Sequence, residues 1–132
     1  MTCGTPKLSW FGFPSASASS GFLILAGPAR ENRSGVLLYT SSGRANQPFQ
    51  GGILCVNTAP LRRGPATLSG GFSPCDGEFG IDMNAFASGN AGGNPAGFLS
   101  VPGSLVNVQW WGRDSLATGS FLSSALEYTQ CP

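Results

Sequence analysis

The chain has 132 residues, with seven Lys and Arg against six Asp and Glu, and its charged fraction is 10%, where an average soluble domain has about 25%. This length corresponds to one domain, 1–132. The near balance of charges leaves no unbalanced basic stripe for nucleic acid. No apolar run approaches the ~20 residues of a membrane-spanning helix. We therefore expect no nucleic-acid partner and no membrane-embedded segment.

The composition favours short strands joined by turns. Gly (20 residues) and Pro (10 residues) are abundant, and long helix-favouring runs are missing. Strand-like runs alternate with turn clusters, and we expect strands at residues 8–13, 21–26, 35–40, 52–57, 66–69, 78–84, 105–111 and 122–129. Seven to eight such strands predict an all-β fold, a two-sheet antiparallel β-sandwich that is Ig-like or jelly-roll-like, with a barrel as the alternative.

Two runs show a clear period of two, so their side chains alternate between faces. In 105–111 the predicted core face carries Val106, Val108 and Trp110, and the other face carries Asn107, Gln109 and Trp111. In 78–84 the predicted inward set is Phe79, Ile81 and Met83, and the outward set is Glu78, Asp82 and Asn84. The mixture of amides and an indole on the second face of 105–111 is typical of an exposed strand that contacts sugar.

Exposed aromatic rings beside amides are the basis of a carbohydrate-binding hypothesis. The candidate ligand-binding residues are Trp111, Gln109, Asn107, Trp10 and Tyr128, with Tyr39 as a further aromatic candidate. The alternative is that these rings pack in the core, where an aromatic side chain buries about 150–250 Å². We expect Trp110 in the core, whereas the mixed face of Trp111 fits both interpretations.

The acidic segment at Asp76, Glu78 and Asp82 could hold calcium, because hard cations prefer several oxygen ligands. The twelve-residue spacing of a dedicated calcium loop is absent, and the alternative is an ordinary polar turn. No other cofactor is predicted.

Catalysis is not expected. The chain has no histidine, and Lys7 is its one lysine, so the usual base for a serine or cysteine nucleophile is missing. A glycosidase would need a carboxylate pair across the scissile bond, and only the acidic segment around Asp82 could supply one. We therefore predict that the protein is not an enzyme.

Four widely spaced cysteines indicate disulfides rather than a zinc site, because zinc sites bring two ligands close together and usually add histidine. They are Cys3, Cys55, Cys75 and Cys131. Two disulfides in an oxidising compartment are predicted, with three possible connectivities. The expected location is extracellular or at the cell surface.

Two stretches resemble a C-terminal domain of large secreted proteins of planctomycete and myxobacterial type. They are PFQGGILCVNTAPLRRG (48–64) and VQWWGRDS followed by FLSSALEYTQCP (108–132). The matching positions are Phe49, Leu54, Cys55, Arg63, Gln109, Trp110, Trp111, Arg113, Asp114, Leu122, Ser123, Ala125, Cys131 and Pro132. Gly112 departs from the aromatic residue that is usual there, and the match is weakest across 70–97.

The resemblance implies a secreted β-sandwich module attached to varied partner domains, with no established activity. It also implies the pairing Cys3–Cys55, which leaves Cys75–Cys131. For Arg63 and Asp114 we expect a structural ion pair that pins the end of the Trp111 strand, since bidentate arginine–carboxylate geometry is directional. The alternative is a ligand-binding role for the Arg113–Asp114 charges.

Two functions follow from these patterns. The first is a non-catalytic accessory module that binds carbohydrate or another surface polymer. The second is a structural, self-assembling domain of a bacterial envelope or extracellular filament, because few charges mean little repulsion between copies and exposed sheet edges can pair.

Overall fold

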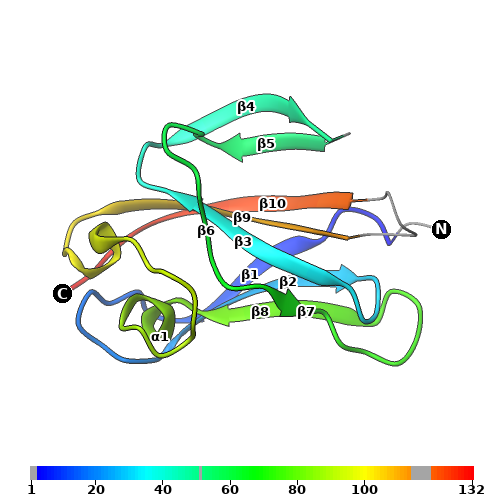
Figure 1. The fold of residues 1–132 in the computed structure, drawn as a ribbon, viewed down its shortest axis with the longest axis horizontal. Helices are drawn as coiled ribbons and strands as arrows, with labels where there is room; N and C mark the ends of the chain where they lie inside the picture. The colour runs from blue at the N-terminus through cyan, green and yellow to red at the C-terminus, as the bar shows by residue number, and fades with distance from the viewer. Residues whose placement is uncertain (1–2, 51, 114–119) are drawn as a thin grey trace.

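The computed structural model describes residues 3–50, 52–113 and 120–132. The described residues form ten strands and two short helical segments, arranged as an antiparallel β-sandwich with a third layer on one side (Figure 1). The predicted all-β sandwich is confirmed. The strand number exceeds the predicted seven to eight because β4 and the two-residue strand β6 were not expected.

The two main sheets are antiparallel throughout their strand pairs. The smaller sheet has the order β1–β2–β8, with β1 at Lys7–Gly12, β2 at Phe22–Ala29 and β8 at Gly77–Asp82. The larger sheet has the order β10–β9–β3–β6, with β10 at Ser120–Thr129, β9 at Leu105–Arg113, β3 at Ser34–Thr40 and β6 at Arg62–Arg63. The short strand β7 (Thr67–Leu68) also pairs with β3.

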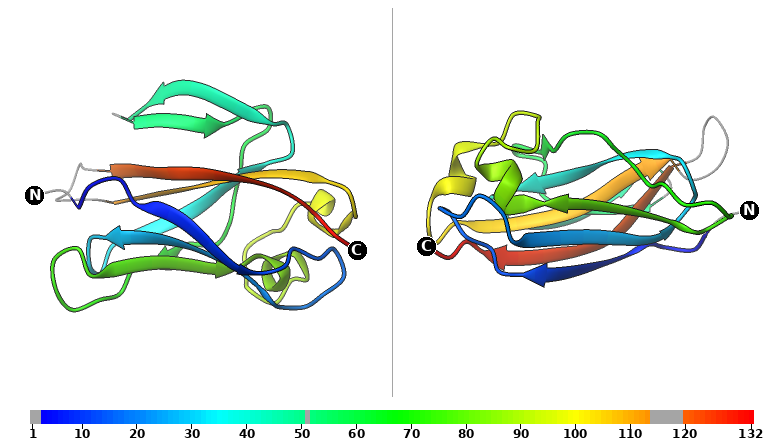
Figure 2. Two further views of the ribbon diagram at one scale, coloured as in Figure 1. Left: turned by 180° about the vertical axis from the view of Figure 1, so that it is seen from behind. Right: turned by 90° about the horizontal axis from the view of Figure 1, so that it is seen from below.

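The third layer is a hairpin of β4 (Arg44–Phe49) and β5 (Gly52–Val56). It lies on the side of the larger sheet that faces away from β1, β2 and β8, as views from the front and from behind agree (Figures 1 and 2). We call this side of the larger sheet the hairpin face. We did not predict β4 from the sequence, because this segment has the composition of a turn. In the structure its residues Asn46, Gln47 and Pro48 are exposed.

The main core fills the space between the two large sheets. β2 and β8 contribute Phe22, Ile24 and Phe79, and the larger sheet contributes Tyr39 and Trp110, all with 2% exposure or less. Phe79 stacks on Trp110 with ring centroids 5.3 Å apart. The predicted inward sets of both alternating runs are confirmed, as is the burial of Trp110.

A second, smaller core lies between the hairpin and the hairpin face. Its buried members are Leu38, Leu54, Val56 and Leu122, and the partly buried side chains packed against them are Val36, Phe49, Leu61 and Trp111. The larger sheet is therefore covered on both faces over part of its length. This arrangement explains why the second face of β9 is less exposed than its amides suggest.

The run predicted as a strand at 78–84 ends at Asp82, where a short helix begins. Helix α1 spans Met83–Ala87, and a 3-10 turn, η1, spans Gly97–Ser100 beside it at the end of the sandwich that holds the C-terminus (Figure 2). Asn84 was predicted to point outward, which is wrong, because it is 2% exposed. Its Nδ2 donates to the carbonyls of Phe13 and Ser20 at 3.0 Å, and its Oδ1 accepts from the N–H of Ser15. Asn84 thus holds the β1–β2 loop in place.

The predicted disulfide pairing is wrong. Cys3 pairs with Cys75 across 72 residues of sequence, and Cys55 and Cys131 are free thiols. Cys55 lies on β5 in the hairpin layer, whereas Cys75 precedes β8 in the smaller sheet. Because Cys3 lies beside Cys75, the larger sheet separates it from Cys55, and the predicted Cys3–Cys55 bond does not form. Within the described ranges, no helix has the length and apolar character to cross a membrane.

Candidate functional site

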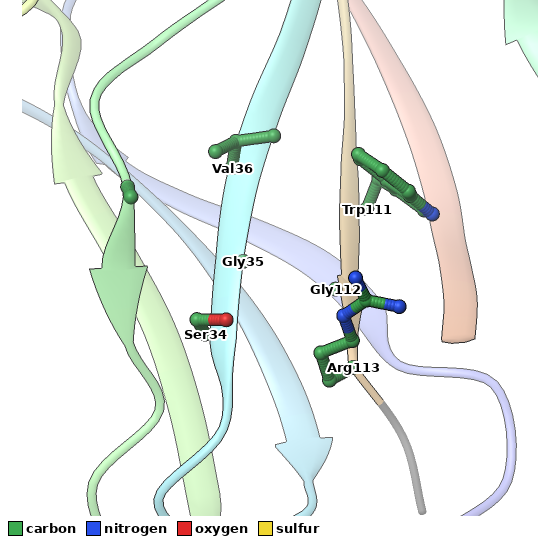
Figure 3. A pocket seen from close by; sticks show the side chains of 7 residues that line it. Ser34, Gly35, Val36, Trp111, Gly112 and Arg113 are labelled. Carbon is green, nitrogen blue, oxygen red and sulfur yellow. The ribbon is translucent and has the colours of Figure 1, made fainter. Parts of the chain in front are cut away.

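A cavity of about 130 Å³ opens on the hairpin face between β3 and β9. Its lining residues are Ser34, Gly35, Val36, Ala66, Trp111, Gly112 and Arg113 (Figure 3). We call it the Trp111 cleft. It is smaller than the roughly 300–1,000 Å³ of typical small-molecule sites, so it suits one group or residue of a larger ligand.

Two glycines shape the floor of the Trp111 cleft. Gly35 and Gly112 are register partners on β3 and β9, and a Cβ added to either would lie 2.8 Å from an aromatic ring of the core, Phe79 or Phe121. These positions must therefore face the core without a side chain. Their neighbours alternate onto the hairpin face, which brings Trp111 and Arg113 to the cleft.

Trp111 forms one wall of the cleft and is held from several sides. Its Nε1 donates to Oε1 of Gln50 at 3.3 Å, and the same oxygen accepts from the hydroxyl of Ser120 at 2.9 Å. Phe49 meets the indole edge to face, with centroids 5.9 Å apart. The guanidinium carbon of Arg63 lies 5.8 Å from the ring centroid, within cation–π range. Trp111 is partly exposed, so it serves both the second core and the cleft.

The two amides of the predicted sugar-contacting strand are not exposed. Gln109 is 1% exposed, and its Nε2 donates to the carbonyls of Ile53 and Ser123 at 3.0 and 2.7 Å. Its Oε1 accepts from the N–H of Cys55 at 2.9 Å. The interpretation of this face as exposed is therefore wrong at Gln109, which instead binds the hairpin to the sheet.

Asn107 is also buried, at 3% exposure, and the interpretation of it as an exposed ligand contact is wrong. Its Nδ2 donates to Oε2 of Glu127. Arg44 donates to both oxygens of the same carboxylate, from Nε to Oε2 at 3.1 Å and from Nη2 to Oε1 at 3.0 Å. The hydrogen bond from Arg44, with that from Asn107, lowers the pKa of Glu127. These three side chains join β4 to β9 and β10.

The remaining aromatic candidates lie away from the cleft. Tyr128 packs edge to face on Phe22, with centroids 5.0 Å apart, and burial raises the pKa of its hydroxyl. It packs against the main core but is partly exposed, so its role as a ligand contact stays a prediction. Tyr39 is fully buried, and its hydroxyl accepts from the N–H of Ala96. Trp10 is 55% exposed on β1 in the other sheet, where its role as a ligand contact stays a prediction.

Asp82 has a structural role that its sequence context did not reveal. Partial burial alone would raise the pKa of its carboxyl, but backbone N–H donors of Gly21, Ala85, Phe22 and Asn84 outweigh this effect and the net pKa is lowered. Its oxygens thus cap α1 and hold the start of β2 at distances of 2.8 to 3.3 Å.

Asp76 and Glu78 lie at another surface hollow, beside Gly27 and Pro28, while Asp82 does not line it. In the part of the chain that the structure describes, no three His, Cys, Asp or Glu side chains gather as a metal site. Calcium binding by these three residues stays a prediction. The Arg63–Asp114 ion pair also stays a prediction, since Asp114 lies outside the described residues.

The residues behind Trp111 are Phe49, Gln50 and Val36; the sequence named Phe49 only as a position of the family resemblance and did not single out the other two. One signal was present. Gly51-Gly52 between two runs is a hairpin signature, and a hairpin there would bring Phe49 and Gln50 over the neighbouring sheet.

Comparison of the chain with family models, with curated proteins and with solved structures finds no match. The cleft itself offers an aromatic ring, a serine hydroxyl and a guanidinium. These groups can stack and donate hydrogen bonds.

Proposed function

We propose that the protein is a non-catalytic module that binds carbohydrate or another surface polymer at the Trp111 cleft. The observation that carries the proposal is a partly exposed indole beside Ser34 and Arg113, over a floor of two glycines. Aromatic rings supply an apolar face for a sugar ring, and neighbouring donors can bind its hydroxyls.

The residue inventory supports binding without catalysis. The whole chain has no histidine and one lysine, Lys7, and Lys7 lies on β1 in the other sheet. Among the described residues of the cleft lining, Ser34 carries the one hydroxyl, and none of them can take up its proton at neutral pH. Within these residues a nucleophilic mechanism lacks its general base.

We also propose an extracellular or cell-surface location and, on the residues quoted above, membership of the secreted accessory-domain family. The disulfide Cys3–Cys75 supports an oxidising compartment, because such bonds are rare in the cytosol. Neighbouring domains of a larger secreted protein would then be its covalent partners.

Binding is tested by affinity electrophoresis of the folded domain in gels that contain a panel of neutral and acidic polysaccharides. We expect retardation by at least one, and its loss in Trp111→Ala. The matched control is Trp10→Ala, a substitution of the same kind at an exposed tryptophan in the other sheet. Absence of retardation across the panel, or equal loss in both variants, contradicts the proposal.

A second candidate function, self-assembly, is favoured by the edge strand β1. Trp10, Phe11 and Phe13 are 55%, 60% and 82% exposed, and β1 pairs with β2 alone in its sheet. Leu8 of this edge donates its N–H to Oγ of Ser124 on β10, and the apolar side chains beyond it can meet another copy. Sedimentation velocity across a hundredfold concentration range tests this, and a monomer throughout would refute self-assembly.

A further inference from the structure

We propose that the Trp111 cleft takes an anionic group, a carboxylate or sulfate carried by an acidic polysaccharide. This inference rests on the proposed function and narrows its ligand class. It follows from the placement of two arginines around the indole and from the positions of the acidic residues.

The strand register brings the two arginines to the same face as Trp111. Cross-strand partners point to the same side of a sheet. Arg63 on β6 is the partner of Leu38 on β3, and Leu38 belongs to the second core. Arg63 therefore projects onto the hairpin face, where its guanidinium lies over the Trp111 ring. Arg113 follows Trp111 by two residues on β9 and reaches the same face beside the cleft (Figure 3).

Both arginines are exposed, and neither forms an ion pair with a carboxylate in the described ranges. Of the acidic residues there, Glu31 pairs with Arg30 at 3.9 Å. Glu127 pairs with Arg44 at 3.0 Å. These two carboxylates are thus engaged by other arginines.

The other described carboxylates lie on β8 or just before it. Asp82 caps α1, and Asp76 and Glu78 border the hollow beside β2. The described ranges, which leave out Asp114, therefore place two guanidinium groups without a carboxylate partner at one cleft. Guanidinium groups bind carboxylate and sulfate oxygens through charge-assisted hydrogen bonds.

The cleft dimensions fit one acidic sugar residue rather than a length of polymer. An indole wall can take the apolar side of the ring, and Arg113 can meet the acidic substituent. Arg63, held over the indole, adds a second positive charge to the same position. A neutral sugar would use the indole and leave both guanidinium groups with water alone.

Isothermal titration calorimetry with polygalacturonate and its fully methyl-esterified form compares the same backbone with and without carboxylates. Dextran sulfate and dextran give the same comparison for sulfate. We expect at least tenfold tighter binding to an acidic member than to its neutral match, with affinity falling between 50 and 200 mM NaCl. Which acidic member binds identifies the source of the anion.

Variants locate the anion at the cleft. Arg113→Gln is expected to weaken acidic binding about tenfold. The matched control is Arg62→Gln, because Arg62 is exposed on the same strand as Arg63 but is the partner of Tyr39, which faces the main core. It is expected to change affinity less than twofold. Circular dichroism melts verify that each variant folds.

The outcomes separate the two proposals. Equal binding of acidic and neutral members would overturn the anionic inference and leave polymer binding intact. Binding of neither would overturn both. Equal weakening by Arg113→Gln and Arg62→Gln would show diffuse charge attraction and overturn the assignment to the cleft.

Discussion

The amide of Gln109 is expected to be the main polar link between the β4–β5 hairpin and the sandwich. Replacement by leucine, of similar size, removes three hydrogen bonds at once: two to the carbonyls of Ile53 and Ser123 and one from the N–H of Cys55. At about 1 kcal/mol net per bond the loss is about 3 kcal/mol, and backbone groups stranded without a partner would add to it. For a chain of this length that corresponds to a melting temperature lower by about 10 °C.

The assay is urea denaturation with Gln47→Leu as the matched control, because Gln47 is exposed on β4. The control is expected to change the free energy of unfolding by less than about 0.5 kcal/mol. Amide hydrogen exchange adds a local readout, with faster exchange at Cys55 in Gln109→Leu. Equal effects of the two substitutions, or unchanged exchange at Cys55, would refute the role assigned to Gln109.

Three further predictions concern stability. Cys3→Ser is expected to lower the free energy of unfolding by about 4 kcal/mol on the chain-entropy model for its 72-residue separation, while Cys55→Ser has little effect. Titration of the unreduced, denatured protein should find two thiols. A count of zero or four would contradict the pairing. Because the pKa of Asp82 is lowered in the folded state, its contribution to stability is present above about pH 4 and is lost as the pH falls through the folded pKa. In urea melts from pH 7 to pH 3, the free energy of unfolding of Asp82→Ala should therefore fall less with acid than that of the unaltered protein. Parallel pH dependences of the two proteins would refute the capping role. Gly35→Ala should lower the free energy of unfolding by about 1–3 kcal/mol, since its Cβ would lie 2.8 Å from a core ring. Gly97→Ala is the control and should be nearly neutral, because the space around its Cβ is open. Equal melting temperatures of the two variants would contradict the packing.

The main sandwich could be predicted from the sequence because its strands carry strong alternation. Val106, Val108 and Trp110 are all fully buried, as their period of two indicates. The turn residues also marked most strand limits, and β3 and β5 begin and end within one residue of the predicted ranges. Local pattern is sufficient where one face of a strand is apolar.

The hairpin layer could not be predicted, because its evidence is not local. β4 is exposed at four of its six positions, and it becomes a strand by pairing with β5 and placing Phe49 in the second core. Burial of Gln109 follows from that layer. An amide that is exposed in a two-layer sandwich is buried in a three-layer one, and the sequence of β9 alone is the same in both cases.

The candidate site was predicted in part. Trp111 was singled out because its face is mixed, and the structure gives it a mixed role between the second core and the cleft. The polar neighbours expected beside it, Asn107 and Gln109, turned out to support the hairpin. The cysteine pairing could not be predicted from the sequence either, because four cysteines allow three connectivities. The choice among them depends on which layers of the fold bring two cysteines together.

The central claim is that the Trp111 cleft is the binding surface, and a titration followed by NMR tests it most directly. Uniformly ¹⁵N-labelled domain is titrated with the polysaccharide that retards it most in affinity electrophoresis. We predict that the largest shifts fall on the indole Nε1–H of Trp111 and on the amides of Ser34, Gly112 and Arg113, while the indole of Trp10 stays unchanged. Shifts centred on β1 and Trp10, with the cleft signals unmoved, would contradict the account.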